Sequence, residues 1–327
     1  MNGEELTEQE TALYDRQIRV WGADAQRRLS KSHILVYGMK GTVAEFCKNI
    51  VLAGVGSVTL VDDREVTEEA LSANFLILPD ENLYHGKTLA ECKFCAFLVV
   101  QVKSLSFAGL QVTYQPLVLN SLESSMPWLS AAALLRKKYL LKLINQKCRK
   151  LSKRVAFYTV DCRGSCGEIF VDLKDYKYSK KKLEETVECQ LEFPSFEDTI
   201  SVPWKALPKR VSKLYFAMRV IEQFEDAEGR NPGETSIADL PGVLKLRKEL
   251  CETNSVNESQ IPDALLERLL IGTSEYPPVC AIIGGILGQE VIKAISGKGD
   301  PLKNFFFFDA MDGKGLIEDI SEPKPVS

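Results

Sequence analysis

The stretch from His33 to Asp62, HILVYGMKGTVAEFCKNIVLAGVGSVTLVD, decides the fold of this chain. It begins with an apolar, β-branched run that predicts a buried strand, and this run ends at the glycine turn 38–41. Apolar residues at helical spacing then predict a helix that ends at Gly54, and Ser57–Val61 predicts a second strand. Strand, glycine turn, helix, strand and a carboxylate about 20 residues past the turn are typical of a doubly wound, nucleotide-binding α/β sheet.

The glycine turn is incomplete for a nucleotide site. In the Gly-x-Gly-x-x-Gly pattern, the second glycine lets a phosphate approach the backbone and the third lets the helix pack on its strand. Those places hold Lys40 and Val43, whereas Gly38 is kept and Gly41 stands beside the missing position. We therefore expect the fold to be kept and the nucleotide pocket to be degraded, with an unusual working site as the alternative.

The composition is that of an intracellular globular protein. The chain has 327 residues, 45% hydrophobic and 26% charged, which allows a large core and about two domains. A net charge of −4 gives no electrostatic case for nucleic acid, and we read neither a signal peptide nor a membrane span. Nine cysteines favour reduced thiols, and two histidines without ligand spacing argue against a metal site. We expect no bound metal, no membrane partner and a nuclear location, with the cytoplasm as the alternative.

The N-terminal segment 4–21 has the spacing of one amphipathic helix and contains two arginines three residues apart, Arg16 and Arg19. Spacing alone favours a solvated surface stripe. Further along, the charged stretch Tyr176–Glu188 predicts a solvated loop or helix, and Ser212–Glu225 predicts a helix with a core stripe.

Two features near the C-terminus predict close packing. Gly284, Gly285 and Gly288 in an apolar helix indicate a neighbouring backbone that packs close against them. Asn304–Asp309 is too apolar for a free edge strand, so it should be buried in the sheet or in an interface.

Four stretches together resemble the enzymes that activate ubiquitin-like proteins, and among them the smaller, regulatory subunits of SUMO-activating enzymes. The similarity extends over residues 8–92 and 142–317, and the four stretches are Tyr14–Gly22, Lys48–Gly56, Pro278–Glu290 and Asn304–Asp309. This resemblance implies a doubly wound, Rossmann-like adenylation-type domain built from residues 1–172 and 263–327. It also implies a smaller, mainly helical domain inserted at 173–262.

The resemblance also implies an inactive nucleotide site. Active halves of these enzymes hold ATP with an aspartate, an asparagine and arginine, and a lysine; this chain keeps Asp62 and Lys87 but has Ala73 at the place of the arginine. Without that arginine, the charge that develops on the pyrophosphate leaving group has no local clamp. Gly38, Gly41, Asp62 and Lys87 are the remaining candidates for nucleotide binding.

By the same resemblance, Arg16 reaches across the subunit interface to the ATP polyphosphate in the active half. A guanidinium suits this role because it is always charged and donates hydrogen bonds in a planar fork. ATP, magnesium and the reactive thiol would lie on the large catalytic subunit, which adenylates the C-terminal glycine of SUMO. The predicted function is therefore a catalytically incomplete, regulatory subunit of a heterodimer, inactive alone.

Two alternatives of other classes stay open. An NAD-dependent Rossmann oxidoreductase would share the opening unit of the fold, but it should keep the second glycine of the turn. A non-enzymatic scaffold would share the degraded pocket, but it would leave Arg16 unexplained.

Residues 93–141 depart from the family pattern. Glu123 is the single acid among them, although the chain has 45 acidic residues. Gln111–Tyr114 predicts a strand, but residues 125–133 do not read as the next one, and Pro116 and Pro127 suit an inner strand poorly. A shifted reading frame or a wrongly joined exon explains the change better than gradual divergence. We therefore expect the sheet to lack a regular strand at its switch point.

Overall fold

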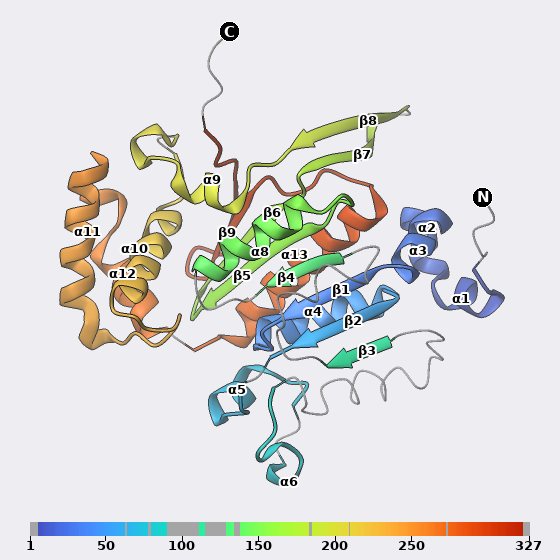
Figure 1. Ribbon diagram of the computed structural model, residues 1–327, viewed down its shortest axis with the longest axis horizontal. Coiled ribbons are helices and arrows are strands. Elements are labelled where there is room, and N and C mark those ends of the chain that lie inside the picture. The colour runs from blue at the N-terminus through green and yellow to red at the C-terminus, as the bar shows by residue number, and fades with distance from the viewer. Residues whose placement is uncertain are drawn as a thin grey trace.

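An eight-stranded sheet forms the centre of the molecule, in the order β10-β9-β6-β5-β4-β1-β2-β3 (Figure 1). The computed structural model describes residues 6–322 except 63, 78–79, 90–110, 115–128, 134–137, 183–184, 209 and 273. Pairing is parallel from β3 to β5 and antiparallel from β5 through β6 and β9 to β10. The strands are β1 (His33–Tyr37), β2 (Ser57–Val61), β3 (Gln111–Tyr114), β4 (Leu129–Ala133), β5 (Ala156–Arg163), β6 (Cys166–Asp172), β9 (Phe305–Asp309) and β10 (Lys314–Glu318).

The predicted opening unit is confirmed. β1 and β2 pair in parallel and are joined by α4 (Gly41–Leu52), whose buried face carries the apolar stripe. Gly38 and Gly54 adopt φ values of +83° and +84°, so glycine is needed both where the chain leaves β1 and where α4 ends.

The expectation that the sheet would lack a strand at its switch point is wrong. β4 lies between β1 and β5 and pairs in parallel with both. Its sequence, Leu-Ser-Ala-Ala-Ala, has no β-branched residue, and the hydrogen bonds offered by two neighbouring strands override this weak propensity. The strand predicted at Gln111–Tyr114 is confirmed as β3, whereas Pro116 and Pro127 lie outside the described residues. The origin of segment 93–141 stays a prediction, which transcript sequencing would test.

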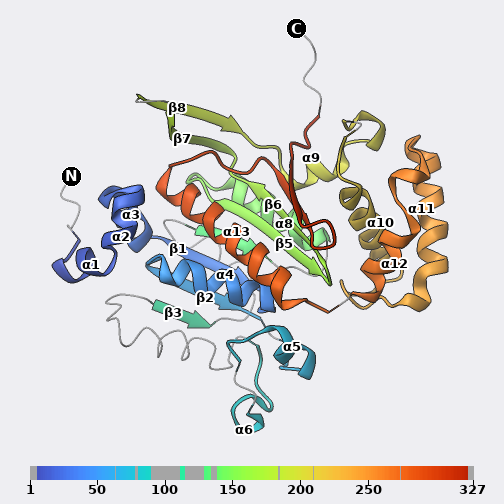
Figure 2. The ribbon, with the colours of Figure 1, turned by 180° about the vertical axis from the view of Figure 1, so that it is seen from behind.

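Helices cover both faces of the sheet (Figures 1 and 2). α4 and α13 (Pro277–Ser296) pack on one face, and α8 (Lys138–Lys150) and α10 (Lys213–Ala227) pack on the other. Alternate residues of β9 divide between the two cores, since Phe306 joins the α13 side and Phe305 joins the α10 side. The prediction that Asn304–Asp309 is buried in the sheet is confirmed.

The glycines of α13 explain how closely it packs on α4. A Cβ atom on Gly284 would lie 2.7 Å from the Thr42 carbonyl oxygen, and one on Gly288 would lie 3.0 Å from Asn49 Cβ. A Cβ atom on Gly285 would meet no atom within 4 Å, so the prediction fails for that glycine. By length and composition α13 could cross a membrane, which the sequence reading overlooked, but 61% of its most apolar window is buried in the protein.

The charged segment expected as a loop or helix is an antiparallel hairpin, so that prediction is wrong. β7 (Asp175–Lys182) pairs with β8 (Glu185–Glu192). The segment pairs because alternate side chains anchor it: the Tyr176 and Tyr178 rings are buried and stacked with centroids 5.5 Å apart. The Lys177 side chain between them is exposed, as are Glu185 and Glu188 on β8.

A helical region follows the hairpin and packs directly on the sheet. Tyr215 of α10 contacts Phe305 and Phe307 edge to face, at centroid distances of 5.7 and 6.1 Å. The region shares the sheet's core on that side, and α12 (Asp263–Ile271) packs on α10 and α11 (Leu240–Asn254). The helix predicted at Ser212–Glu225 is confirmed as α10, and the domain boundaries at 173 and 262 stay a prediction. The helices are α9 (Phe196–Ser201), α10, α11 (Leu240–Asn254) and α12 (Asp263–Ile271), with 3₁₀ turns at Trp204–Ala206, Ile237–Asp239 and Glu258–Gln260.

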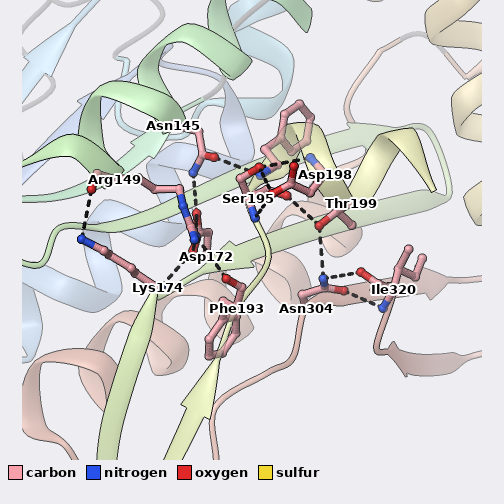
Figure 3. Close-up of polar contacts among 11 residues, drawn as sticks. Asn145, Arg149, Asp172, Lys174, Phe193, Ser195, Asp198, Thr199, Asn304 and Ile320 are labelled. Atoms are coloured by element: carbon pink, nitrogen blue, oxygen red, sulfur yellow. Dashed lines mark hydrogen bonds and ion pairs between the residues drawn. The ribbon is translucent and has the colours of Figure 1, made fainter. Parts of the chain in front are cut away.

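A buried polar network fixes α8 and α9 to the sheet (Figure 3). Asp172 of β6 accepts hydrogen bonds from Asn145 at 2.7 Å and from Arg149 at 2.8 Å. Asn145 Oδ1 accepts the backbone N–H of Phe196 at 2.9 Å, which ties α9 to α8. Below it, the Asn304 side chain exchanges hydrogen bonds with the backbone of Ile320, at 2.8 and 2.9 Å. These buried polar groups are paired, so the network holds the layers in register.

The N-terminal segment is two helices followed by a third, so the prediction of one helix over 4–21 is wrong. α1 (Glu8–Leu13) ends where Tyr14 leaves helical geometry, at φ −98° and ψ 14°, and α2 (Asp15–Trp21) begins there. The Tyr14 side chain is buried, and its ring stands close above Gly54 at the end of α4. α3 (Ala23–Ser30) leads into β1, and α5 (Glu68–Ala73) and α6 (Glu81–Tyr84) follow β2.

Candidate functional site

A pocket of about 440 Å³ lies at the first turn of α4, beside the C-terminal ends of β1 and β2. Ligands of doubly wound sheets bind at this edge, outside the carboxyl ends of the strands. The lining combines both charge signs. It consists of Met39, Lys40, Arg64, Glu65, Thr67, Ala70, Ala73, Leu89, Pro232, Gly233, Glu234 and Glu275.

Asp62 at the end of β2 is engaged by the protein itself. Its carboxylate accepts the backbone N–H of Met39 at 2.7 Å and the side-chain Nε of Arg64 at 2.8 Å, and it also pairs with Arg64 Nη2. The side chain is buried, with 4% exposure. In a dinucleotide site the acid at this place binds a ribose hydroxyl. Here its two oxygens hold the glycine turn and Arg64.

The first turn of α4 is capped from a distant part of the chain. Lys40 is the N-cap residue, and its side chain offers no acceptor to the free N–H groups of the turn. Glu275 supplies the acceptor: its carboxylate takes the N–H of Gly41 at 2.6 Å and the N–H of Thr42 at 3.2 Å. The Thr42 hydroxyl donates to the same carboxylate at 2.5 Å.

Gly41 is required by a close approach of α5. A Cβ atom on Gly41 would lie 2.5 Å from the carbonyl oxygen of Ala73, and the Asn74 side chain donates to the Met39 carbonyl at 2.9 Å. The glycine turn and the end of α5 are therefore packed backbone to backbone, which leaves little space between them.

None of the four candidates, Gly38, Gly41, Asp62 and Lys87, is among the described lining residues. Gly41 and Asp62 stand directly behind the lining, because Gly41 donates to Glu275 and Asp62 binds Met39 and Arg64. The Lys87 backbone carbonyl accepts the N–H of Val66 at 3.2 Å, so the backbone at Lys87 is hydrogen-bonded to the connection that follows β2. Sequence reasoning missed Glu275 and Arg64. Glu275 stands 234 residues from Gly41 in the sequence, and no local sequence pattern predicts a contact over that separation.

Arg16 lies elsewhere, on α2, and its side chain is exposed. α2 sits against the C-terminal end of α4, opposite the end that carries the pocket (Figures 1 and 2). Arg16 is therefore not a residue of this chain's own pocket.

Comparison with known proteins places this geometry in a family. A profile described as the ThiF family matches residues 14–325, nearly the whole chain. The chain belongs to the ThiF family. Its closely similar members include SUMO-activating enzyme subunits 1B-1 and 1A of Arabidopsis thaliana, each 66% identical, with 98% of this chain and 99% of each relative covered. SUMO-activating enzyme subunit 1 of Danio rerio is 32% identical, with 96% of this chain and 95% of the relative covered.

Solved structures of distantly similar proteins share the fold. E. coli MccB, in a structure with MccA-N7isoASN, has a TM-score of 0.56 at 13% identity and covers 98% of this chain and 75% of its own. PaaA has a TM-score of 0.55 at 14% identity and covers 98% of this chain and 76% of its own. The predicted doubly wound, adenylation-type fold and the resemblance to small SUMO-activating subunits are thereby confirmed. These relatives do not favour the oxidoreductase alternative.

The pocket does not fit the ATP that the fold of this ThiF-family chain implies. The N–H groups that would meet a phosphate already donate to Glu275 and Asp62, and Ala73 stands where a clamping arginine is expected. Within the described ranges, no group of three or more His, Cys, Asp or Glu side chains is placed to hold a metal ion. The cysteines that the structure describes form no disulfide with one another and are mostly buried, and burial raises the pKa of the Cys148 thiol to about 12.

Proposed function

We propose that this chain is the smaller, catalytically incomplete subunit of a heterodimeric SUMO-activating enzyme. It would support the ATP-dependent adenylation of SUMO and its transfer to a thiol, both on the larger catalytic subunit. The observation that carries the proposal is the 66% identity, over nearly the whole chain, to proteins named SUMO-activating enzyme subunit 1. The name of these relatives implies a partner subunit.

The pocket supports the catalytic incompleteness of this chain. An adenylating site must hold the polyphosphate of ATP and stabilise the charge that develops on pyrophosphate. Here the donors of the glycine turn are committed to internal carboxylates, and Ala73 supplies no positive charge. ATP and magnesium would therefore bind on the partner subunit.

Arg16 would then be this chain's contribution to the reaction. Its guanidinium is exposed, and no described residue forms an ion pair or hydrogen bond with it. An always-charged fork of this kind can enter a polyphosphate site on another subunit with little rearrangement. A scaffold without a catalytic contribution is the competing function, and it would make Arg16 dispensable.

Pyrophosphate exchange tests the proposal. The purified chain alone should show no SUMO-dependent exchange of pyrophosphate into ATP, and it should gain full exchange when combined with the large subunit. A pull-down with the large subunit checks assembly in the same preparation. Robust exchange by the chain alone would contradict the incompleteness, and failure to bind the large subunit would contradict the subunit assignment. Imaging of the tagged chain would test the expected nuclear location.

A further inference from the structure

The helix that carries Arg16 is too short to hold its own direction. α2 has seven residues, and isolated helices of fewer than about 12 residues are marginal in water. Helical geometry is broken on both sides of α2, at Tyr14 before it and at Gly22 after it. The orientation of α2 is therefore set by its contacts with the rest of the protein.

Those contacts come from one face of α2. Tyr14, Gln17, Ile18 and Trp21 follow one another at the helical spacing i, i+3, i+4 and i+7, and all four are buried or half-buried. Arg16 lies on the opposite face and is exposed. Whatever fixes the inner face of α2 thus also fixes the direction in which Arg16 extends.

Two glutamine side chains fasten this inner face to the C-terminal end of α4. The carbonyls of residues 49–51 accept backbone N–H groups of residues 53–55, so Leu52 and Ala53 have the next two carbonyls of the helix end. The side-chain amide of Gln17 donates to the Leu52 carbonyl at 3.0 Å, and that of Gln26, on α3, donates to the Ala53 carbonyl at 2.9 Å.

Gln26 also holds the last residue of α2. Its Oε1 atom accepts the indole N–H of Trp21 at 3.1 Å, and the Gln26 side chain is fully buried. The two glutamines therefore connect the middle and the end of α2 to neighbouring carbonyls of one helix terminus.

We propose that Gln17 and Gln26 are positioning residues for Arg16. Their amides fix α2 on the end of α4 and so set the direction in which the Arg16 guanidinium reaches the partner subunit. The proposal rests on the proposed function, because it requires Arg16 to act on the ATP of the partner. Positioning of this kind affects the rate strongly, since a displacement of about 1 Å can cost about 100-fold.

α4 itself does not depend on this attachment. It packs closely on α13, where Gly284 and Gly288 leave no space for a Cβ atom, and it ends at Gly54 with a φ value of +84°. Loss of one amide at the end of α4 should therefore loosen α2 and leave the sheet and its helices in place.

Gln17→Leu in the heterodimer tests the proposal, because leucine keeps the bulk of the side chain and removes the amide donor. The maximal rate of SUMO-dependent pyrophosphate exchange should fall about tenfold, while the KM values for ATP and SUMO stay within about twofold of wild type. Gel filtration should show wild-type assembly with the large subunit. Gln190→Leu, at an exposed position on β8, is the matched control and should exchange at the wild-type rate.

A double variant separates positioning from a general loss of structure. If Gln17 acts through Arg16, Gln17→Leu should slow exchange by no more than about twofold once Arg16 is replaced by alanine. A general weakening of the fold would instead multiply the two effects. Trp21→Phe removes the indole donor to Gln26 and should give the same pattern, so it carries the test if Gln17→Leu does not fold.

A wild-type rate for Gln17→Leu, or multiplied effects in the double variant, would overturn the proposal and leave Gln17 as a cap of α4. Loss of assembly in Gln17→Leu would overturn it as well, because α2 would then serve docking and not the positioning of Arg16. In both cases a slow Arg16→Ala heterodimer would still support the proposed function. A wild-type rate for Arg16→Ala would contradict the role of Arg16 itself, and the positioning role of the two glutamines would fall with it.

Discussion

The side-chain amide of Gln17 donates a hydrogen bond to the backbone carbonyl of Leu52, at 3.0 Å, and so fixes α2 to the C-terminal end of α4. Lys298 adds a second anchor by donating from Nζ to the carbonyl of Trp21. The pocket lies at the other end of α4, and a helix of 12 residues is about 18 Å long. Arg16 therefore lies on an anchored helix, far from the pocket of this chain. A residue that contacts ATP on a partner subunit would have to lie outside this pocket, as Arg16 does.

Arg16→Ala should slow adenylation by the heterodimer without preventing its assembly. Loss of one charge-assisted contact to the polyphosphate, in a site shielded from water, should cost about 2–4 kcal/mol of transition-state stabilisation, or about 30- to 1000-fold in rate. SUMO-dependent pyrophosphate exchange measures the rate, and gel filtration with the large subunit measures assembly.

Arg19→Ala is the matched control for this prediction. Arg19 lies on the same helix and is also exposed, but its guanidinium is paired with Asp15 at 2.8 Å. The substitution removes the same charge, and the exchange rate should stay within about twofold of wild type because surface ion pairs contribute little. Equal rates for the Arg16→Ala and wild-type heterodimers would leave Arg16 as a solvated surface residue.

Alanine substitutions at two neighbouring glycines of α13, Gly284 and Gly285, should change the free energy of unfolding in opposite directions. Gly284→Ala would place a methyl group 2.7 Å from the Thr42 carbonyl oxygen, so α4 and α13 must separate, and we expect a loss of about 1–3 kcal/mol. In Gly285→Ala the added methyl group has no other atom within 4 Å. The substitution should stabilise the chain by about 0.4–1 kcal/mol, because alanine restricts the unfolded backbone. Urea unfolding of the isolated chain measures both. Equal destabilisation by the two substitutions would contradict the packing described for α13.

Helices and strands were predicted correctly where the spacing of their apolar residues matches the face that is buried in the folded protein. β1, α4 and β2 have that agreement, and so does α10, which is apolar over most of its length and is buried continuously from Leu214 to Ile221. β4 was missed because its small residues carry no strand signal and its pairing is decided by β1 and β5. The hairpin β7–β8 was missed because its many charged residues favoured a loop. The buried positions that alternate along β7, Tyr176 and Tyr178, are too few to outweigh that composition.

The candidate site, too, could be predicted only where a local sequence pattern describes it. Lys40 replaces a glycine of the nucleotide-binding motif, and Ala73 stands where the family resemblance implies an arginine, so both indicated from sequence that the pocket would be impaired. The residue that caps the first turn of α4 could not be predicted, since Glu275 reaches α4 only after the chain has passed through the whole helical region. Local spacing describes contacts within one element, whereas this contact depends on the complete topology.

A buried cluster at α10 predicts how stability depends on pH. One nitrogen of Arg219 donates to Glu168 at 2.7 Å and to Glu222 at 2.8 Å, so one cation serves two carboxylates. Burial, together with the charge of Glu222, raises the pKa of Glu168 to about 7, although Arg219 acts in the opposite direction. The folded protein then holds a proton on Glu168 that the unfolded chain releases near its ordinary pKa of 4.5.

Between about pH 4.5 and 7 the folded state therefore binds more protons than the unfolded state, and this group's contribution to stability should fall as the pH rises. A raised pKa of this size corresponds to at most about 3 kcal/mol across that window. Glu168→Gln, which stays neutral and still accepts from Arg219, should remove most of this pH dependence in urea unfolding series. Glu188→Gln, at an exposed position on β8, should leave the dependence unchanged. A Glu168→Gln variant with the slope of wild type would show that Arg219 keeps both carboxylates ionised in the folded chain.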